Sequence, residues 1–177
     1  TPATDATSRG PHLAQVAELM GLNLFGWQRQ VADISMELNH AGRYSYRTVG
    51  VSVGRQNGKS ALLAARIGLE LLAGGQVAYT AQDRGGARLK FQEIVEMLRP
   101  SLGTRFAQVR LANGSECLTM TNGGSFRVVT PSREGARGLT LDLVVIDEAL
   151  AHPLELVGAL GPTMATRPAS QLWIASN

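Results

Sequence analysis

Two short polar groups in the sequence carry side chains suited to binding and splitting a polyphosphate. The first is a loop between a predicted strand and a predicted helix, and it reads Gly54, Arg55, Gln56, Asn57, Gly58, Lys59 and Ser60. Backbone N–H groups at a helix N-terminus attract anions, and a glycine lets the backbone approach them closely. A lysine reaches the β- and γ-phosphates, and a serine hydroxyl can ligate Mg²⁺. We therefore expect residues 55–60 to bind ATP, with Ser60 on the metal.

The loop departs from the standard phosphate-loop pattern at one position. That pattern has a glycine five residues before its second glycine, where this sequence has Val53. Gly-Lys-Ser alone is a weak signal, and a helix start capped by Asn57 is the alternative. The preceding strand, the following helix and Gly54 favour the phosphate loop.

The second group, Asp147-Glu148, ends an apolar run at 141–146. Such a run is typical of a strand buried on both faces, and the carboxyl ends of these strands form the ligand edge of an open α/β sheet. We expect Asp147 to hold Mg²⁺ through water and Glu148 to polarise the water that attacks the γ-phosphate. A helix-capping role is the alternative for either acid.

A phosphate loop followed by this acidic pair predicts an ATPase. Lys59 and Glu148 are the expected catalytic residues, and Ser60 and Asp147 the expected metal-binding residues. The glutamate beside the aspartate favours a hydrolysis-driven motor over a kinase.

The elements that must position these groups alternate along the chain. Helices are predicted at 12–20, 27–38, 59–73, 86–98 and 153–160, and strands at 44–53, 76–81, 106–111, 116–121, 125–130, 141–146 and 172–175. This alternation favours a mostly parallel central sheet flanked by helices, with right-handed crossovers. Asn122-Gly123 favours a tight turn, so we expect a small antiparallel hairpin insertion. With the acidic pair, the pattern predicts an α/β P-loop NTPase of the additional-strand, catalytic-glutamate, helicase-like type.

Two further expectations concern individual elements. In the helix at 86–98, Leu89, Ile94 and Met97 are expected to face inward, and Pro100 is expected to end the helix. The last strand, at 172–175, is expected to end with nothing to cover it, as in a segment of a longer protein.

Composition bounds the remaining possibilities. The 177 residues suit one domain, 44% of them are hydrophobic, and a net charge of +3 permits a nucleic-acid partner without requiring one. The single cysteine, Cys117, excludes an internal disulfide, and the three histidines have no metal-ligand spacing. We find no membrane-length apolar stretch and no signal peptide, so a soluble intracellular protein is expected. We expect a flexible segment at 1–10 and one ATPase domain at 11–177.

From Trp27 to Asn177 the sequence resembles the large terminase subunit of tailed bacteriophages. Arg55 to Ser60 is similar to that family's shifted phosphate loop, which usually lacks the first glycine. Ala136-Arg137-Gly138 before the Asp147-Glu148 strand also resembles the family pattern. Gly26-Trp27-Gln28 resembles its adenine-side motif. Ser176-Asn177 falls at the family's coupling motif but departs from the Thr-rich form often seen there.

The resemblance implies the motor of a genome-packaging machine. Such subunits form a homo-oligomeric ring on the capsid portal, expected to be a pentamer, with a small terminase subunit as partner, and they drive double-stranded DNA into the capsid by ATP hydrolysis. It further implies a viral protein in the host cell cytoplasm, away from membranes. The family's C-terminal metal-dependent nuclease has no counterpart in this chain. We expect the isolated domain to be a monomer.

Several residues have two interpretations each. Arg137, in a glycine-containing loop, is interpreted as a catalytic arginine for transition-state charge, in cis or from a neighbouring subunit, with Arg133 as a weaker rival and a surface arginine as the alternative. Arg55 contacts phosphate in cis or a neighbouring acid. Gln28 is expected to hydrogen-bond adenine. Trp27 either stacks on the base or lies in the core, and the core is favoured.

The region after the second parallel strand has its own alternatives. In helicase-like ATPases, residues equivalent to 79–82 face nucleic acid. Arg84, Arg88 and Lys90 follow, and a solvated basic face is favoured over phosphate contacts. For the whole chain, the alternatives to a packaging motor are a monomeric helicase-like DNA-dependent ATPase, a nucleotide-binding scaffold without turnover, and a small-molecule kinase.

Overall fold

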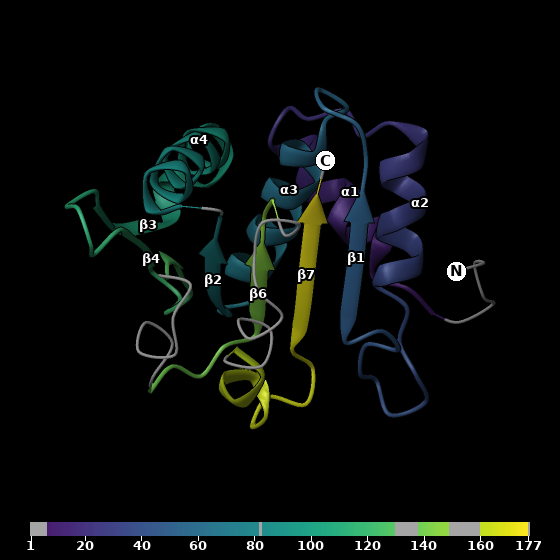
Figure 1. Cartoon of the computed structure of the whole chain (residues 1–177). Helices are drawn as coiled ribbons and strands as arrows, with labels where there is room; N and C mark the ends of the chain where they lie inside the picture. Colours follow the sequence, from purple (N-terminus) through teal and green to yellow (C-terminus); the bar gives the residue numbers. More distant parts are fainter. Residues whose placement is uncertain (1–6, 82, 130–137, 149–159, 177) are drawn as a thin grey trace.

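A computed structural model describes residues 7–81, 83–129, 138–148 and 160–176 (Figure 1). Its helices and strands are α1 (Gly10–Leu19), α2 (Gly26–Ser35), β1 (Thr48–Ser52), α3 (Lys59–Leu72), β2 (Gln76–Thr80), α4 (Arg84–Leu102), a 3₁₀ turn (Gly103–Arg105), β3 (Phe106–Arg110), β4 (Cys117–Met120), β5 (Ser125–Val128), β6 (Leu143–Ile146) and β7 (Gln171–Ser176). The described part of the predicted helix at 153–160 is Leu160, which is helical together with residues 161–164.

The strands form a sheet in the order β1-β7-β6-β2-β5-β4-β3. The five strands from β1 to β5 in this order are parallel, whereas β4 and β3 run antiparallel to their neighbours. The predicted hairpin is therefore confirmed as β4–β5, and β3 extends it. One strand, β7, separates the strand before the phosphate loop from the strand before Asp147. This is the additional strand of the predicted fold class, so the predicted sheet architecture is confirmed.

Apolar side chains cover the sheet on both faces. A large cluster joins α1, α3 and α4 to one face through residues such as Leu62, Ile67 and Phe91. Figure 1 shows α1 and α3 behind the central strands. A smaller cluster on the second face joins Val144 to Leu160. Every residue of β6 is buried, as its uninterrupted apolar sequence requires.

The strand predicted at 44–53 is shorter in the structure. It begins at Thr48, and Tyr44 forms only an isolated antiparallel bridge with Leu38. Residues 7–10 are the described part of the expected flexible segment, and they form backbone contacts with the residues that follow α2. Ser8 bridges Glu37, and the Arg9 N–H donates to the Met36 carbonyl at 3.0 Å.

Helix α4 differs from its prediction in length and in rotation. It continues through Pro100 to Leu102, because Leu98 and Leu102 are buried and their burial offsets the hydrogen bond that proline cannot make. The expectation that Leu89 faces inward is wrong, since its side chain is 66% exposed. The buried stripe contains Ala87 and Phe91, and Leu89, two residues from each, points away from it.

The expectation that the last strand lies uncovered is also wrong. β7 is an interior strand between β1 and β6, and Trp173 within it is fully buried. The buried side-chain amide of Gln171 joins β7 to α2, to α3 and to the segment before β1. Its Nε2 donates to the carbonyls of Ser35 and Tyr46, at 2.8 Å each, and its Oε1 accepts from Arg66 and from Trp173, at 3.2 Å each. No described helix is long and apolar enough to cross a membrane.

Candidate nucleotide site

The loop between β1 and α3, where the phosphate loop is predicted, contains two residues in the left-handed backbone region. Gln56 and Gly58 have positive φ angles of 63° and 82°. A Cβ on Gly58 would lie 2.8 Å from Gln28 Nε2 and 3.2 Å from a ring carbon of Phe25, so glycine is required there. Gly58, rather than Asn57, precedes the helix, and the Asn57 amide donates to the Gly54 carbonyl at 3.2 Å. The alternative of an Asn57 helix cap is therefore wrong.

The Lys59 side chain reaches across the sheet edge to Asp147. Its Nζ lies 2.8 Å from Asp147 Oδ1, and the two side chains are 10% and 4% exposed. The backbone N–H of Glu148 also donates to Oδ1, at 2.9 Å. The two groups predicted from separate segments thus meet at the carboxyl ends of β1 and β6, where parallel strands place their ligands.

Tyr79 is a member of this site that the sequence did not reveal. Its hydroxyl donates to Asp147 Oδ2 at 2.9 Å, and the side chain is buried within β2. Burial raises the pKa of the Tyr79 phenol well above its usual range, and the negative charge of Asp147 raises it further. The phenol therefore stays protonated and remains a donor to the carboxylate. Because β2 lies directly beside β6, strand order alone brings the two side chains together, and strand order is not visible in sequence.

Lys90 points toward the site from α4. Its Nζ donates to Ser60 Oγ at 3.2 Å and lies 2.6 Å from Glu93 Oε2. The favoured interpretation of a solvated basic face is therefore incomplete for this lysine. Arg84 and Arg88, each with its nearest nitrogen 4.0 Å from the buried carboxylate of Glu116, remain partly exposed.

Glu148 occupies the first position after Asp147 at the end of the buried strand. It is exposed, and its φ of 58° is uncommon for a residue other than glycine. Such backbone conformations cost on the order of 1–3 kcal/mol and cluster at functional sites. The turn at this residue ends β6 at the site and brings the Glu148 carboxylate to the surface there.

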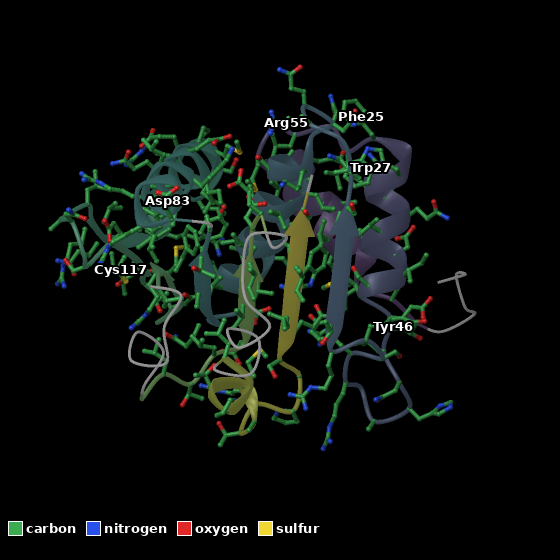
Figure 2. The ribbon with its side chains drawn as sticks, viewed as in Figure 1. Phe25, Trp27, Tyr46, Arg55, Asp83 and Cys117 are labelled. Carbon is green, nitrogen blue, oxygen red and sulfur yellow. The ribbon has the colours of Figure 1, made fainter. Side chains whose placement is uncertain are left out.

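Gln28, predicted to contact adenine, lies close to the loop. Gln28 is buried, its Nε2 donates to the Gly58 carbonyl at 2.8 Å, and its Oε1 accepts from the Phe25 N–H. In this arrangement Gln28 connects the start of α2 to the phosphate loop, and its contact with adenine stays a prediction. Trp27 is half-buried against the core, as favoured. Figure 2 shows Phe25, Trp27 and Arg55 near the end of β1.

Ser60 and Asp147 suit a magnesium ion in the chemistry of their oxygen atoms, and the binding of Mg²⁺ stays a prediction. A serine hydroxyl from Ser60 and a carboxylate from Asp147 are hard donors of the kind Mg²⁺ prefers. Among the described residues, no group of three or more His, Cys, Asp and Glu side chains is arranged to hold a metal. Arg133, Arg137 and Asn177 lie outside the described residues. The carbonyl of Ser176, at the end of β7, accepts from the Val53 N–H at 3.3 Å.

Solved structures share this fold. The large terminase ATPase domain of Thermus phage P74-26 aligns with a TM-score of 0.70 and 24% identity, covering 90% of this chain and 66% of that one. The HK97 bacteriophage large terminase aligns with a TM-score of 0.77 and 19% identity, covering 96% of this chain and 38% of that one. The large terminase of a thermophilic bacteriophage, in complex with ADP, aligns with a TM-score of 0.64 and 14% identity, again over 96% and 38%.

These similarities establish the fold of the chain. It is the fold of the ATPase domains of bacteriophage large terminases. The chain spans about two thirds of the P74-26 domain and 38% of both the HK97 terminase and the ADP-bound terminase. No family model matches the sequence, and no curated protein matches it.

Proposed function

We propose that this chain, with the fold of a large terminase ATPase domain, binds ATP and hydrolyses it as the motor domain of a genome-packaging machine. One observation carries the proposal. The lysine of the phosphate loop and the aspartate of the acidic pair, 88 positions apart, form a nearly buried ion pair at the ligand edge of the sheet. The terminase of the thermophilic bacteriophage, crystallised with ADP and with ATP-gamma-S, supports nucleotide as the ligand.

Each residue then has a role in phosphoryl transfer. The N–H groups at the start of α3 and the ammonium of Lys59 bind the β- and γ-phosphates, so Lys59 exchanges Asp147 for phosphate when ATP binds. Mg²⁺, held by Ser60 and through water by Asp147, would neutralise charge that develops on the phosphates. Tyr79 and the Glu148 N–H keep the Asp147 carboxylate in place. Glu148 accepts a hydrogen bond from the attacking water and orients it toward the γ-phosphorus.

The motor part of the proposal rests on the likeness to terminases. We infer that the chain acts on double-stranded DNA in the cytoplasm of an infected host, as part of a homo-oligomeric ring on the capsid portal with a small terminase subunit. In that setting Arg137 supplies positive charge to the γ-phosphate of its own or a neighbouring site, with Arg133 as its rival. Arg55, exposed in the phosphate loop, contacts phosphate in cis or an acid of the neighbour.

A concentration series tests this function. ATP hydrolysis per protein molecule, measured with Mg²⁺, should rise with protein concentration if a neighbour completes the site. Arg137→Ala should bind ATP like the wild type and lose about 10³-fold or more in turnover. A specific rate that is well above background and independent of concentration would favour a monomeric helicase-like ATPase. ATP binding without turnover at any concentration would favour a nucleotide-binding scaffold.

A further inference from the structure

Among the described residues of α4, Lys90 alone has a side chain that forms a hydrogen bond with the phosphate loop. Its ammonium donates to Ser60 Oγ at 3.2 Å while Glu93, one turn along the same helix, holds it at 2.6 Å. Ser60 is the residue to which the proposed function assigns Mg²⁺. A positive charge is thus already positioned beside the expected metal and phosphate position, on an element outside the phosphate loop and the acidic pair.

The use of lysine in this chain is selective. The sequence contains two lysines, Lys59 and Lys90, against fifteen arginines. Both lysines contact side chains of the candidate nucleotide site, Lys59 at Asp147 and Lys90 at Ser60. A lysine ammonium is a compact charge with three donors on a flexible stem, so it changes partners more readily than the planar guanidinium of arginine. The two lysines therefore suit positions whose partners change when nucleotide binds.

The charges around Lys90 decide which group its ammonium contacts when ATP binds. A divalent cation at Ser60 would repel the nearby ammonium. In phosphoryl-transfer sites the metal binds oxygen atoms of the terminal phosphate, and these oxygens would attract the ammonium. We propose that Lys90 is a second lysine of the nucleotide site, which contacts the terminal phosphate of bound ATP and is held by Ser60 and Glu93 before ATP binds. Because ADP lacks this phosphate, Lys90 discriminates ATP from ADP. This inference rests on the proposed function.

Binding measurements with Lys90→Ala test the discrimination. A charge-assisted hydrogen bond to phosphate predicts that affinity for a non-hydrolysable ATP analogue falls by about 10- to 100-fold, with affinity for ADP changing less than about threefold. Arg99→Ala is the matched control, because Arg99 forms an exposed ion pair with Glu96 three residues away on the same helix, as Lys90 does with Glu93. This control should bind both nucleotides as the wild type does. Equal losses for the analogue and ADP in Lys90→Ala would overturn the inference.

Covalent labelling of the wild type gives a second readout that does not depend on a variant folding. In an acyl-phosphate derivative of ATP, a lysine amine near the terminal phosphate attacks the acyl carbonyl, and the nucleotide phosphate leaves. Peptide mass spectrometry should then find the acyl group on both Lys59 and Lys90, and excess ATP should prevent it. Labelling of Lys59 alone, with normal analogue binding by Lys90→Ala, would overturn the inference and leave ATP binding intact. A wild type that binds neither nucleotide would instead refute the proposed function.

Discussion

Replacing Tyr79 with phenylalanine should weaken the protein by an amount that depends on pH. The substitution removes one hydrogen bond, from a fully buried phenol to a nearly buried carboxylate, and keeps the ring that lies against Phe126. Hydrogen bonds to charged groups contribute about 1.5–3 kcal/mol, so Tyr79→Phe should lower the free energy of unfolding by about that amount at pH 8. Urea denaturation of both proteins measures the difference.

The pH dependence follows from the raised pKa of Tyr79. Above its ordinary value of 10.0, an unfolded chain loses the phenolic proton while the folded chain retains it. The stability contributed by Tyr79 is therefore fully present below pH 10 and declines above it, at about 1.4 kcal/mol per pH unit. Because Tyr79→Phe has no proton to lose at this position, the stability difference between the two proteins should shrink by about that amount between pH 10 and pH 11.

A double-mutant cycle with Asp147→Asn provides the control. In that background the carboxylate is absent, so Tyr79→Phe should cost less than it does in the wild type. The pKa of Tyr46 is also raised, by loss of solvent contact and by the nearby Glu37 carboxylate, and this effect is common to all four proteins and cancels in the comparison. The reasoning is refuted by a stability difference that stays constant from pH 8 to pH 11, or by a cost below about 0.5 kcal/mol at pH 8, well under the range for such bonds.

Three more substitutions test other parts of the site and fold. Glu148→Gln should bind ATP as the wild type does and lose about 10²- to 10⁴-fold in hydrolysis, because the amide is a poor base, and normal turnover would show that another group orients the water. Gly58→Ala should reduce ATP affinity at least tenfold, which corresponds to about 1.4 kcal/mol, because the new methyl group meets Gln28 at 2.8 Å. The control Gly42→Ala has a similar φ of 70° but open space around it, so it should bind ATP normally. Gln171→Leu should lower the free energy of unfolding by about 3 kcal/mol or more, because four buried hydrogen bonds lose their common partner, and a urea midpoint like that of the wild type would contradict this.

The parts of the site formed by contiguous residues could be predicted from the sequence. Residues 54–60 and Asp147-Glu148 carry local signals, and a parallel orientation of the strands before them within one sheet is enough to place both at one sheet edge. The hairpin also has a local cause, because Gly123, with a φ of 87°, meets the requirement of the turn.

Features that depend on the pairing of distant strands or on the rotation of a helix could not be predicted from the sequence. The contact of Tyr79 with Asp147 requires knowing that β2 lies beside β6, and the interior position of β7 requires knowing that β1 and β6 do not pair directly. The prediction that Lys90 lies on a solvated face misses its contact with Ser60. It assumed an inward Leu89, whereas α4 is rotated so that Leu89 is exposed. In each case a tertiary contact, absent from any short window of sequence, decides the position.

The position of β7 sets the width of the nucleotide site. Neighbouring strands lie about 4.8 Å apart, so one intervening strand separates β1 from β6 by about 10 Å. Direct pairing of β1 with β6 would halve that width. The spacer strand β7 is also the last of the described strands along the sequence, more than a hundred residues after the phosphate loop. During synthesis, β7 can therefore enter its place between β1 and β6 only after residues 171–176 have left the ribosome.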